Sequence, residues 1–117
     1  MKPLKYSPTE TDQINLDTKT IFEYPNFSEN MSVAKMVVNG RHPEEENTFT
    51  LEHECQFVMY VVKGNGTVYA GDEIFEVKEN DVVYVPVKNK FAVEGSLEYI
   101  TFVNPAFFPE QVEELVI

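Results

Sequence analysis

Four short apolar segments separated by turn-forming residues constrain the fold of this chain more than any other feature. From Cys55 to Pro86 the sequence reads CQFVMYVVKGNGTVYAGDEIFEVKENDVVYVP. Residues 56–62 are almost all β-branched, aromatic or long apolar, as in a strand buried on both faces. The glycines, asparagines and charged residues at 63–66, 71–72 and 78–81 favour chain reversals. The stretch therefore predicts a meander of four antiparallel strands, at 56–62, 67–70, 73–77 and 82–85.

Further strands are predicted on both sides of the meander. Residues 20–24, 32–38 and 48–51 precede it, residues 90–93 and 97–103 follow it, and turn signals separate them. Residues 1–18 are polar and threonine-rich, which indicates an extended arm. Pro109 begins a segment, residues 109–116, that is predicted to form a short helix with one apolar side. About eight short strands at regular spacing indicate a closed or double-sheet antiparallel β architecture, which also protects apolar strand edges.

Charge and length limit the possible partners. The chain has 117 residues, enough for one domain over residues 1–117, and a formal net charge of −11. Such a field repels phosphate backbones and anionic headgroups, so neither nucleic acid nor a membrane is expected as a partner. The single cysteine, Cys55, cannot form an internal disulfide, and no apolar run approaches a membrane span. We therefore expect a cytoplasmic protein with an unreactive thiol, because the acidic neighbours of Cys55 disfavour the thiolate.

Two segments of the meander carry a family resemblance. YVVKGNG (60–66) resembles the end of the first cupin motif, and NDVVYVP (80–86) resembles the start of the second. The tail NPAFFPEQ (104–111) is similar to the ending of some single-domain cupins. The resemblance implies a small RmlC-like double-stranded β-helix, the cupin jelly-roll barrel, with its core over residues 33–103 and a short C-terminal helix.

The positions at which cupins bind a metal ion differ in this chain. Counted back from the motif glycine, the glutamate position is occupied by Phe57, and the histidine of the second motif by Phe91. The histidine pair of the first motif falls on Leu51 and His53, or on residues 50 and 52 in the longer spacing. A divalent metal needs three or four N, O or S donors, and phenylalanine offers none. We therefore expect no metal and no cofactor.

The resemblance and the strand alternation together define a candidate pocket. We expect it to be lined by residues of the barrel interior, namely Leu51, His53, Phe57, Met59, Val61 and Phe91. His53 could serve as a general acid or base, with Tyr60 or Tyr84 as its hydroxyl partner, or it could simply be hydrogen-bonded at the mouth of the barrel. Two further questions stay open: whether the interior is open or filled, and whether His42, His53 and nearby glutamates form a different metal site.

Three functions are compatible with these residues. The leading hypothesis is a metal-independent cupin that binds a small organic ligand in an apolar-walled barrel, as a homodimer. The first alternative is a sugar isomerase or epimerase that uses His53 as a base, although Arg41 is the only arginine available to bind a diphosphate. The second is a structural or regulatory dimerisation module with a filled barrel. The resemblance places Tyr60 and Val62 on the outer face, which in cupins often forms a dimer contact.

Overall fold

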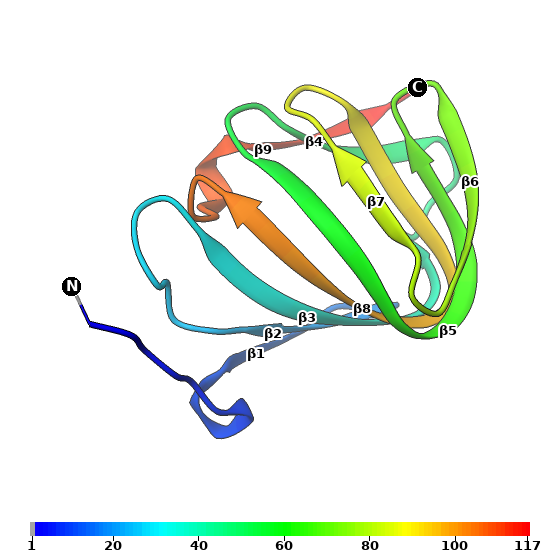
Figure 1. Ribbon diagram of the computed structural model, residues 1–117. Coiled ribbons are helices and arrows are strands. Elements are labelled where there is room, and N and C mark those ends of the chain that lie inside the picture. The colour runs from blue at the N-terminus through cyan, green and yellow to red at the C-terminus, as the bar shows by residue number, and fades with distance from the viewer. Residues whose placement is uncertain (1) are drawn as a thin grey trace.

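A computed structural model describes residues 2–117, so the first residue of the predicted arm lies outside the described part. Nine strands form one strongly curled antiparallel sheet around an interior (Figure 1). The prediction of an all-β chain is confirmed. The strands are β1 (Asp12–Asn15), β2 (Lys19–Glu23), β3 (Ser32–His42), β4 (Thr48–Glu52), β5 (Gln56–Ala70), β6 (Glu73–Lys78), β7 (Val82–Val85), β8 (Lys90–Asn104) and β9 (Val112–Val116), and the two 3-10 turns are η1 (Pro8–Glu10) and η2 (Pro109–Gln111).

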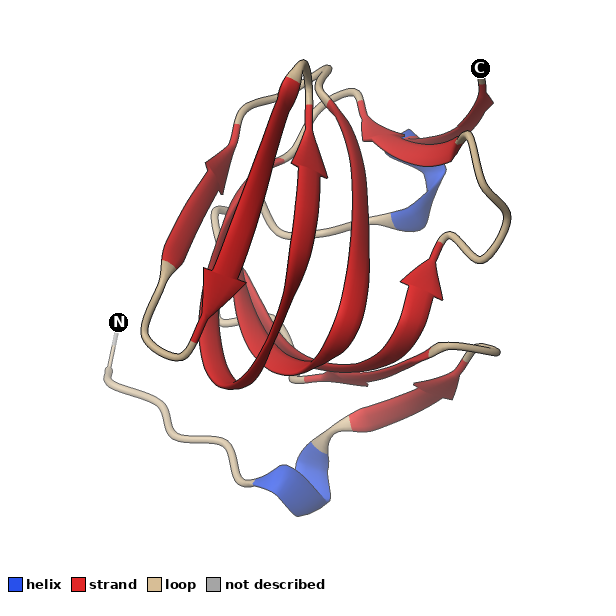
Figure 2. Ribbon diagram, turned by 90° about the vertical axis from the view of Figure 1, so that its right-hand side faces the viewer, coloured by secondary structure: helices blue, strands red, loops and turns tan. Residues whose placement is uncertain are grey.

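Strand order brings distant parts of the chain together. The main path runs β1-β2-β3-β8-β4-β9, and β5 joins it through β8 while also pairing with β6 and β7. Each half of the long strand β5 has its own partner, since β7 pairs with residues 57–60 and β6 with residues 65–70. Figure 2 shows the same curled sheet from the side, with its strands in red and the two short helical turns in blue.

Two predicted turns are wrong, because β5 and β8 each run through them as one strand of 15 residues. Gly40, Gly95 and Gly66 lie in register across β3, β8 and β5. A Cβ on Gly66 would lie 2.3 Å from the carbonyl oxygen of Glu94, and one on Gly95 would lie 2.6 Å from that of Asn65. These glycines therefore permit close approach of bent strands, and they do not reverse the chain.

The predicted C-terminal helix is also wrong. Pro109 begins only the single 3-10 turn η2, and residues 112–116 continue as β9, which pairs antiparallel with β4. Val112 and Leu115 are partly buried while Val116 is 78% exposed. A segment this short gains more from pairing with the free edge of β4 than from an isolated helical turn.

The core lies between the two halves of the curled sheet. Met59, Val61, Val68 and Val93 are fully buried, and fourteen buried side chains form one cluster. Cys55 is buried at the start of β5, and burial raises the pKa of its thiol, so the thiolate is scarce at neutral pH. Among residues 2–117, no helix has the length and apolar character needed to cross a membrane.

Candidate active-site cavity

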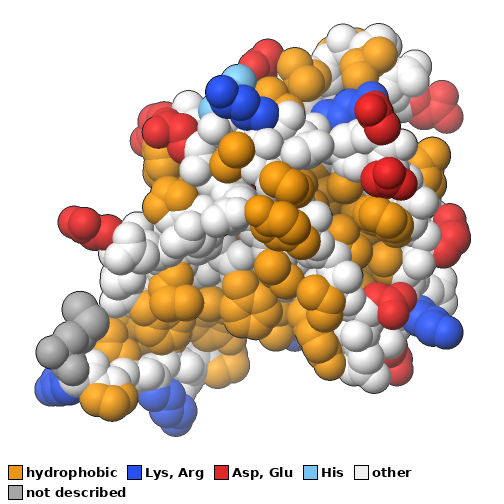
Figure 3. Space-filling view, turned by 45° about the horizontal axis from the view of Figure 1, so that its top comes forward, with side chains coloured by type: hydrophobic (Ala, Val, Ile, Leu, Met, Phe, Trp, Pro, Cys, Tyr) orange, Lys and Arg blue, Asp and Glu red, His pale blue; other side chains and the backbone are white. Residues whose placement is uncertain are grey.

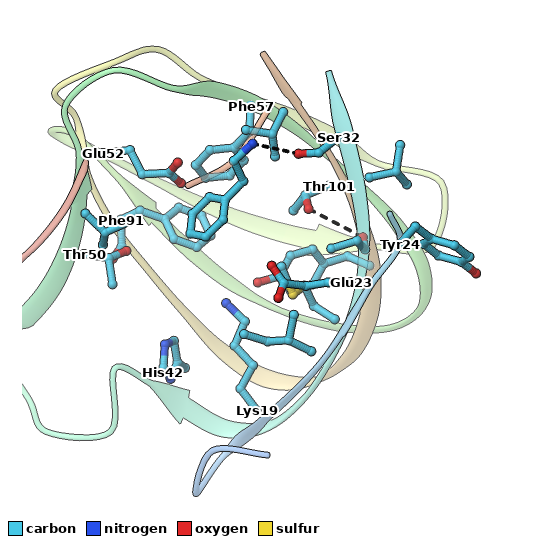
Figure 4. A pocket seen from close by; sticks show the side chains of 18 of the residues that line it. Lys19, Glu23, Tyr24, Ser32, His42, Thr50, Glu52, Phe57, Phe91 and Thr101 are labelled. Carbon is cyan, nitrogen blue, oxygen red and sulfur yellow. Dashed lines mark hydrogen bonds between the residues drawn. The ribbon is translucent and has the colours of Figure 1, made fainter. Parts of the chain in front are cut away.

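One end of the curled sheet encloses a cavity of about 250 Å³. Its wall is mostly apolar and comes from strands far apart in the sequence, including β2, β3, β5 and β8. The polar side chains that line it are Lys19, Glu23, Tyr24, Asn26, Ser32, His42, Thr50, Glu52, Tyr99 and Thr101 (Figure 4). Seen from the top of the molecule, hydrophobic side chains gather across the middle of the surface, and most acidic side chains stand toward its margin (Figure 3).

Lys19 brings an amine into this cavity from the first residue of β2. The side chain is partly buried, and its amino group lies 5.9 Å from the centre of the Tyr99 ring. Burial lowers the pKa of Lys19 to about 8, and the opposing attraction of Glu52 does not restore it. A substantial fraction of this lysine is therefore neutral in slightly alkaline solution.

Glu52 is the acidic group of the cavity, and Gln111 holds it in place. The side-chain oxygen of Gln111 accepts hydrogen bonds from the backbone N–H groups of Glu54 and Cys55, at 3.0 and 3.2 Å. Its amide nitrogen must then face Glu52, to whose Oε1 it donates at 2.8 Å. Burial raises the pKa of Glu52, while the Gln111 hydrogen bond and Lys19 oppose that rise. The other carboxyl oxygen of Glu52 does not bond to Gln111, so it is available to a ligand in the cavity.

His42 ends β3 on the opposite wall. Burial, together with the positive charges of Lys19 and Arg41, lowers the pKa of the imidazole to about 4. The neighbouring Arg41 donates hydrogen bonds to the backbone oxygens of Pro43, Glu45 and Thr48, at 2.6, 2.7 and 2.9 Å. Arg41 therefore fixes the loop after His42, and the ring stays neutral at physiological pH with a lone pair available.

Tyr99 is the one buried side chain in residues 2–117 whose polar atom lacks a hydrogen-bond partner. The residue is 1% exposed, lines the cavity, and has a pKa raised by burial and by the charge of Glu52. An unpaired buried hydroxyl costs about 1–3 kcal/mol. The hydroxyl has almost no accessible surface, so it is a buried donor without a partner in the wall of the cavity.

Phe57 and Phe91 lie at the cavity wall, as the motif comparison predicts. Their rings meet edge to face, with centroids 5.1 Å apart. Within residues 2–117, no three His, Cys, Asp or Glu side chains gather closely enough to hold a metal ion. With Phe57 and Phe91 in place, the cupin metal position does not have enough donors to fit a metal ion. His42 and His53 also do not gather with glutamates into a different metal site.

Three of the predicted reactive residues lie elsewhere. His53 is on the surface, its Nε2 2.8 Å from Oε1 of Glu113, and it does not line the cavity, so its predicted place in the barrel is wrong. Tyr60 and Tyr84 are 37% and 55% exposed on the outer face, where their hydroxyls donate to Asn80 and Gln56. The local reason is a turn at 53–54, which carries His53 out of β4 toward β9.

The remaining predicted pocket residues lie beside the cavity. Met59 and Val61 are completely buried in the core next to it, and Leu51 is partly buried on β4, so these three are not part of the wall. Phe57 and Phe91 are the two of the six predicted residues that line it. Since side chains alternate along a strand, Met59 and Val61 face the same side as Phe57 but deeper in the barrel.

The cavity also contains groups that were not assigned to the predicted pocket. Lys19 follows a polar segment without alternation of apolar and polar residues, so no sequence pattern predicts that its side chain enters the barrel. Tyr99 could have been found, because alternation in LEYITFV puts it on one face with Leu97, Thr101 and Val103. Glu52 occupied a ligand position in the longer motif spacing, which was one of two alternatives.

Comparison with known proteins supports the fold. No protein-family model and no curated protein sequence matches the chain. Among solved structures, Streptomyces Pac13, described as a nucleoside dehydratase, is 22% identical with a TM-score of 0.87, over 99% of this chain and 93% of that one. An RmlC-like cupin from Shewanella frigidimarina is 16% identical with a TM-score of 0.72, over 90% and 93%. Ectoine synthase from P. lautus is 12% identical with a TM-score of 0.75, over 97% and 91%. The predicted cupin fold is confirmed.

Proposed function

We propose that this cupin barrel binds a small hydroxylated molecule of nucleoside size and removes water from it by proton transfer, without a metal ion. The observation that carries the proposal is the meeting of Lys19, His42 and Glu52 in one cavity whose accessible wall is mostly apolar. Burial shifts the pKa of each of these groups toward its neutral form. Titratable groups perturbed in this way inside a cleft are typical of acid–base sites.

The three groups can divide the chemistry of an elimination. Neutral His42 can accept a proton from a carbon atom of the substrate. The electron pair of the broken C–H bond forms a C=C bond, and the neighbouring C–O bond breaks. Glu52, whose pKa is raised by burial, can give a proton to the departing oxygen, which leaves as water. The ammonium form of Lys19 stabilises negative charge that develops between these steps.

The comparisons support this reaction class and ligand size. Pac13 is described as a nucleoside dehydratase, and three of its structures contain uridine. A cavity of about 250 Å³ lies below the roughly 300 Å³ at which sites for drug-sized ligands begin, which favours a ligand on the scale of a sugar or a nucleoside.

Binding can be tested with uridine, cytidine, adenosine and the free sugars, followed by NMR chemical shifts of the protein. We expect saturable shifts at residues of the cavity and weaker binding in His42→Gln. His53→Gln is the matched control, because it removes the other histidine from the surface. If none of these compounds shifts a cavity resonance at millimolar concentration, the proposed function is wrong.

The isomerase or epimerase alternative has less support. His53, Tyr60 and Tyr84 do not meet in one site. Arg41 is the one arginine, and its Nη1 already donates to three backbone oxygens of the neighbouring loop, so the site has no cluster of cations for a diphosphate. A module with a completely filled barrel would not leave a cavity of about 250 Å³.

We also propose that the protein is a homodimer that packs through its outer face. Exposed apolar side chains lie together there on neighbouring strands β5, β7 and β8, namely Tyr60, Val62, Val82, Tyr84 and Phe102. These five side chains carry no charge in a chain of net charge −11, so two copies can pack against one another there with little repulsion. Sedimentation equilibrium should give a dimer that Tyr84→Asp dissociates and Val116→Asp, on β9, does not. A wild-type monomer at high protein concentration would contradict this.

A further inference from the structure

The amine of Lys19 has no ionic partner. Among residues 2–117, the two ion pairs are Lys35 with Glu98 and His53 with Glu113, and both lie at the surface. No carboxylate oxygen is within 4.0 Å of the Lys19 amine, although Glu52 is close enough to attract it. The ring of Tyr99, 5.9 Å away, is at the limit of a cation–π contact. A partly buried ammonium group without an ionic partner contributes little to the stability of the fold.

The cavity around this amine has the groups that a carbonyl addition requires. Glu52 and His42 line the same space from opposite walls, one as a proton donor and the other as a proton acceptor (Figure 4). Glu23 also lines this space, and Tyr99 forms part of its wall. The accessible wall is otherwise mostly apolar, and apolar surroundings favour the loss of water from an adduct.

We propose that Lys19 is a nucleophile that forms a Schiff base with small aldehydes or ketones in this cavity. The lone pair of the amine forms a C–N bond to the carbonyl carbon while the C=O π bond breaks and its oxygen takes a proton. The nitrogen then loses a proton to His42. Glu52 protonates the hydroxyl group, which leaves as water as the C=N bond forms. One carbonyl compound and one amine thus give one imine and one water, with no oxidant or reductant.

The neutral form of the amine is what makes this reaction possible near neutral pH. With its pKa lowered to about 8, Lys19 is half deprotonated at pH 8, whereas an ordinary lysine has a pKa of about 10.4. The inference rests on the proposed function in that both place the substrate in one cavity. The adduct itself, however, needs no turnover of a nucleoside.

Reductive trapping tests the inference directly. The full-length protein is incubated with dihydroxyacetone and sodium cyanoborohydride, and the modified lysines are quantified by peptide mass spectrometry. We expect Lys19 to be modified at least about tenfold faster than exposed Lys63 and Lys88, because its amine is less protonated. The rate should saturate with the ketone and rise with pH to a plateau above about 8. Trapping of Lys19 no faster than of Lys63 would overturn the proposal.

Variants separate this inference from the proposed function. Lys63→Arg should leave the labelling of residue 19 unchanged, and Glu52→Gln should slow it. Lys19→Arg should abolish it, and if that variant does not fold, the site-resolved labelling of the wild type still decides. A trapped Lys19 without nucleoside binding would refute only the proposed function. Nucleoside binding with an unreactive Lys19 would refute only the Schiff base.

Discussion

Replacing Lys19 with methionine should stabilise the protein near neutral pH. Methionine keeps the apolar stem and removes the enclosed amine. The fall in the pKa of Lys19 from 10.5 to about 8 corresponds to about 3 kcal/mol, since a change of one in pKa is worth about 1.4 kcal/mol. This is an upper limit, because loss of the lysine also leaves the buried Glu52 without its nearest positive charge.

The pH dependence identifies the cause of that stabilisation. A pKa that is lower in the folded state means that the folded protein binds the proton less tightly than the unfolded chain does. The lowered pKa therefore reduces the free energy of unfolding of the wild type by its full amount below about pH 8. This reduction disappears as the pH rises to about 10.5. The gain in Lys19→Met should be greatest at pH 7 and should vanish by pH 10.5.

Urea unfolding of wild type and variant at several pH values measures this gain. Lys63→Met is the control, because that lysine is exposed on β5 and its replacement should change the free energy of unfolding by less than about 0.5 kcal/mol. A Lys19→Met variant that is less stable than wild type at pH 7, or a gain that does not change between pH 7 and 10.5, would refute the assignment of Lys19 as an unpaired enclosed amine.

Two further substitutions test how the fold supports the cavity. Gln111→Met should lower the free energy of unfolding by about 3 kcal/mol, because it removes three hydrogen bonds from a residue that is 3% exposed. Gln13→Met on exposed β1 is the control in urea unfolding, and an equal effect of the two would contradict the role of Gln111. Gly66→Ala should cost about 3 kcal/mol or more, since its Cβ would lie 2.3 Å from a backbone oxygen. Ser96→Ala at an exposed position of the neighbouring strand should change the midpoint little, and a Gly66→Ala variant as stable as wild type would rule out the close strand approach.

Sequence patterns alone determined the fold class and the location of Phe57 and Phe91. Alternating apolar residues predicted β6 and β7, with β6 extending one residue further, and the motif spacing placed Phe57 and Phe91 at the wall of the barrel. These features are local or depend on fixed intervals from nearby glycines. These predictions are correct because side-chain alternation follows directly from strand geometry.

Only the tertiary structure decided what the glycines do and which polar groups meet. Gly64-Asn65-Gly66 fits a turn and a close strand crossing equally well, and the choice depends on β8, whose Gly95 lies opposite. Lys19, Glu52 and Tyr99 are far apart in the chain, and strand order brings them to one cavity. In the shorter motif spacing His53 falls on a ligand position inside the barrel. In the structure it lies on the surface beside Glu113. Position along a sequence does not specify which side of a closed sheet a loop residue will face, because that depends on the strands packed around it.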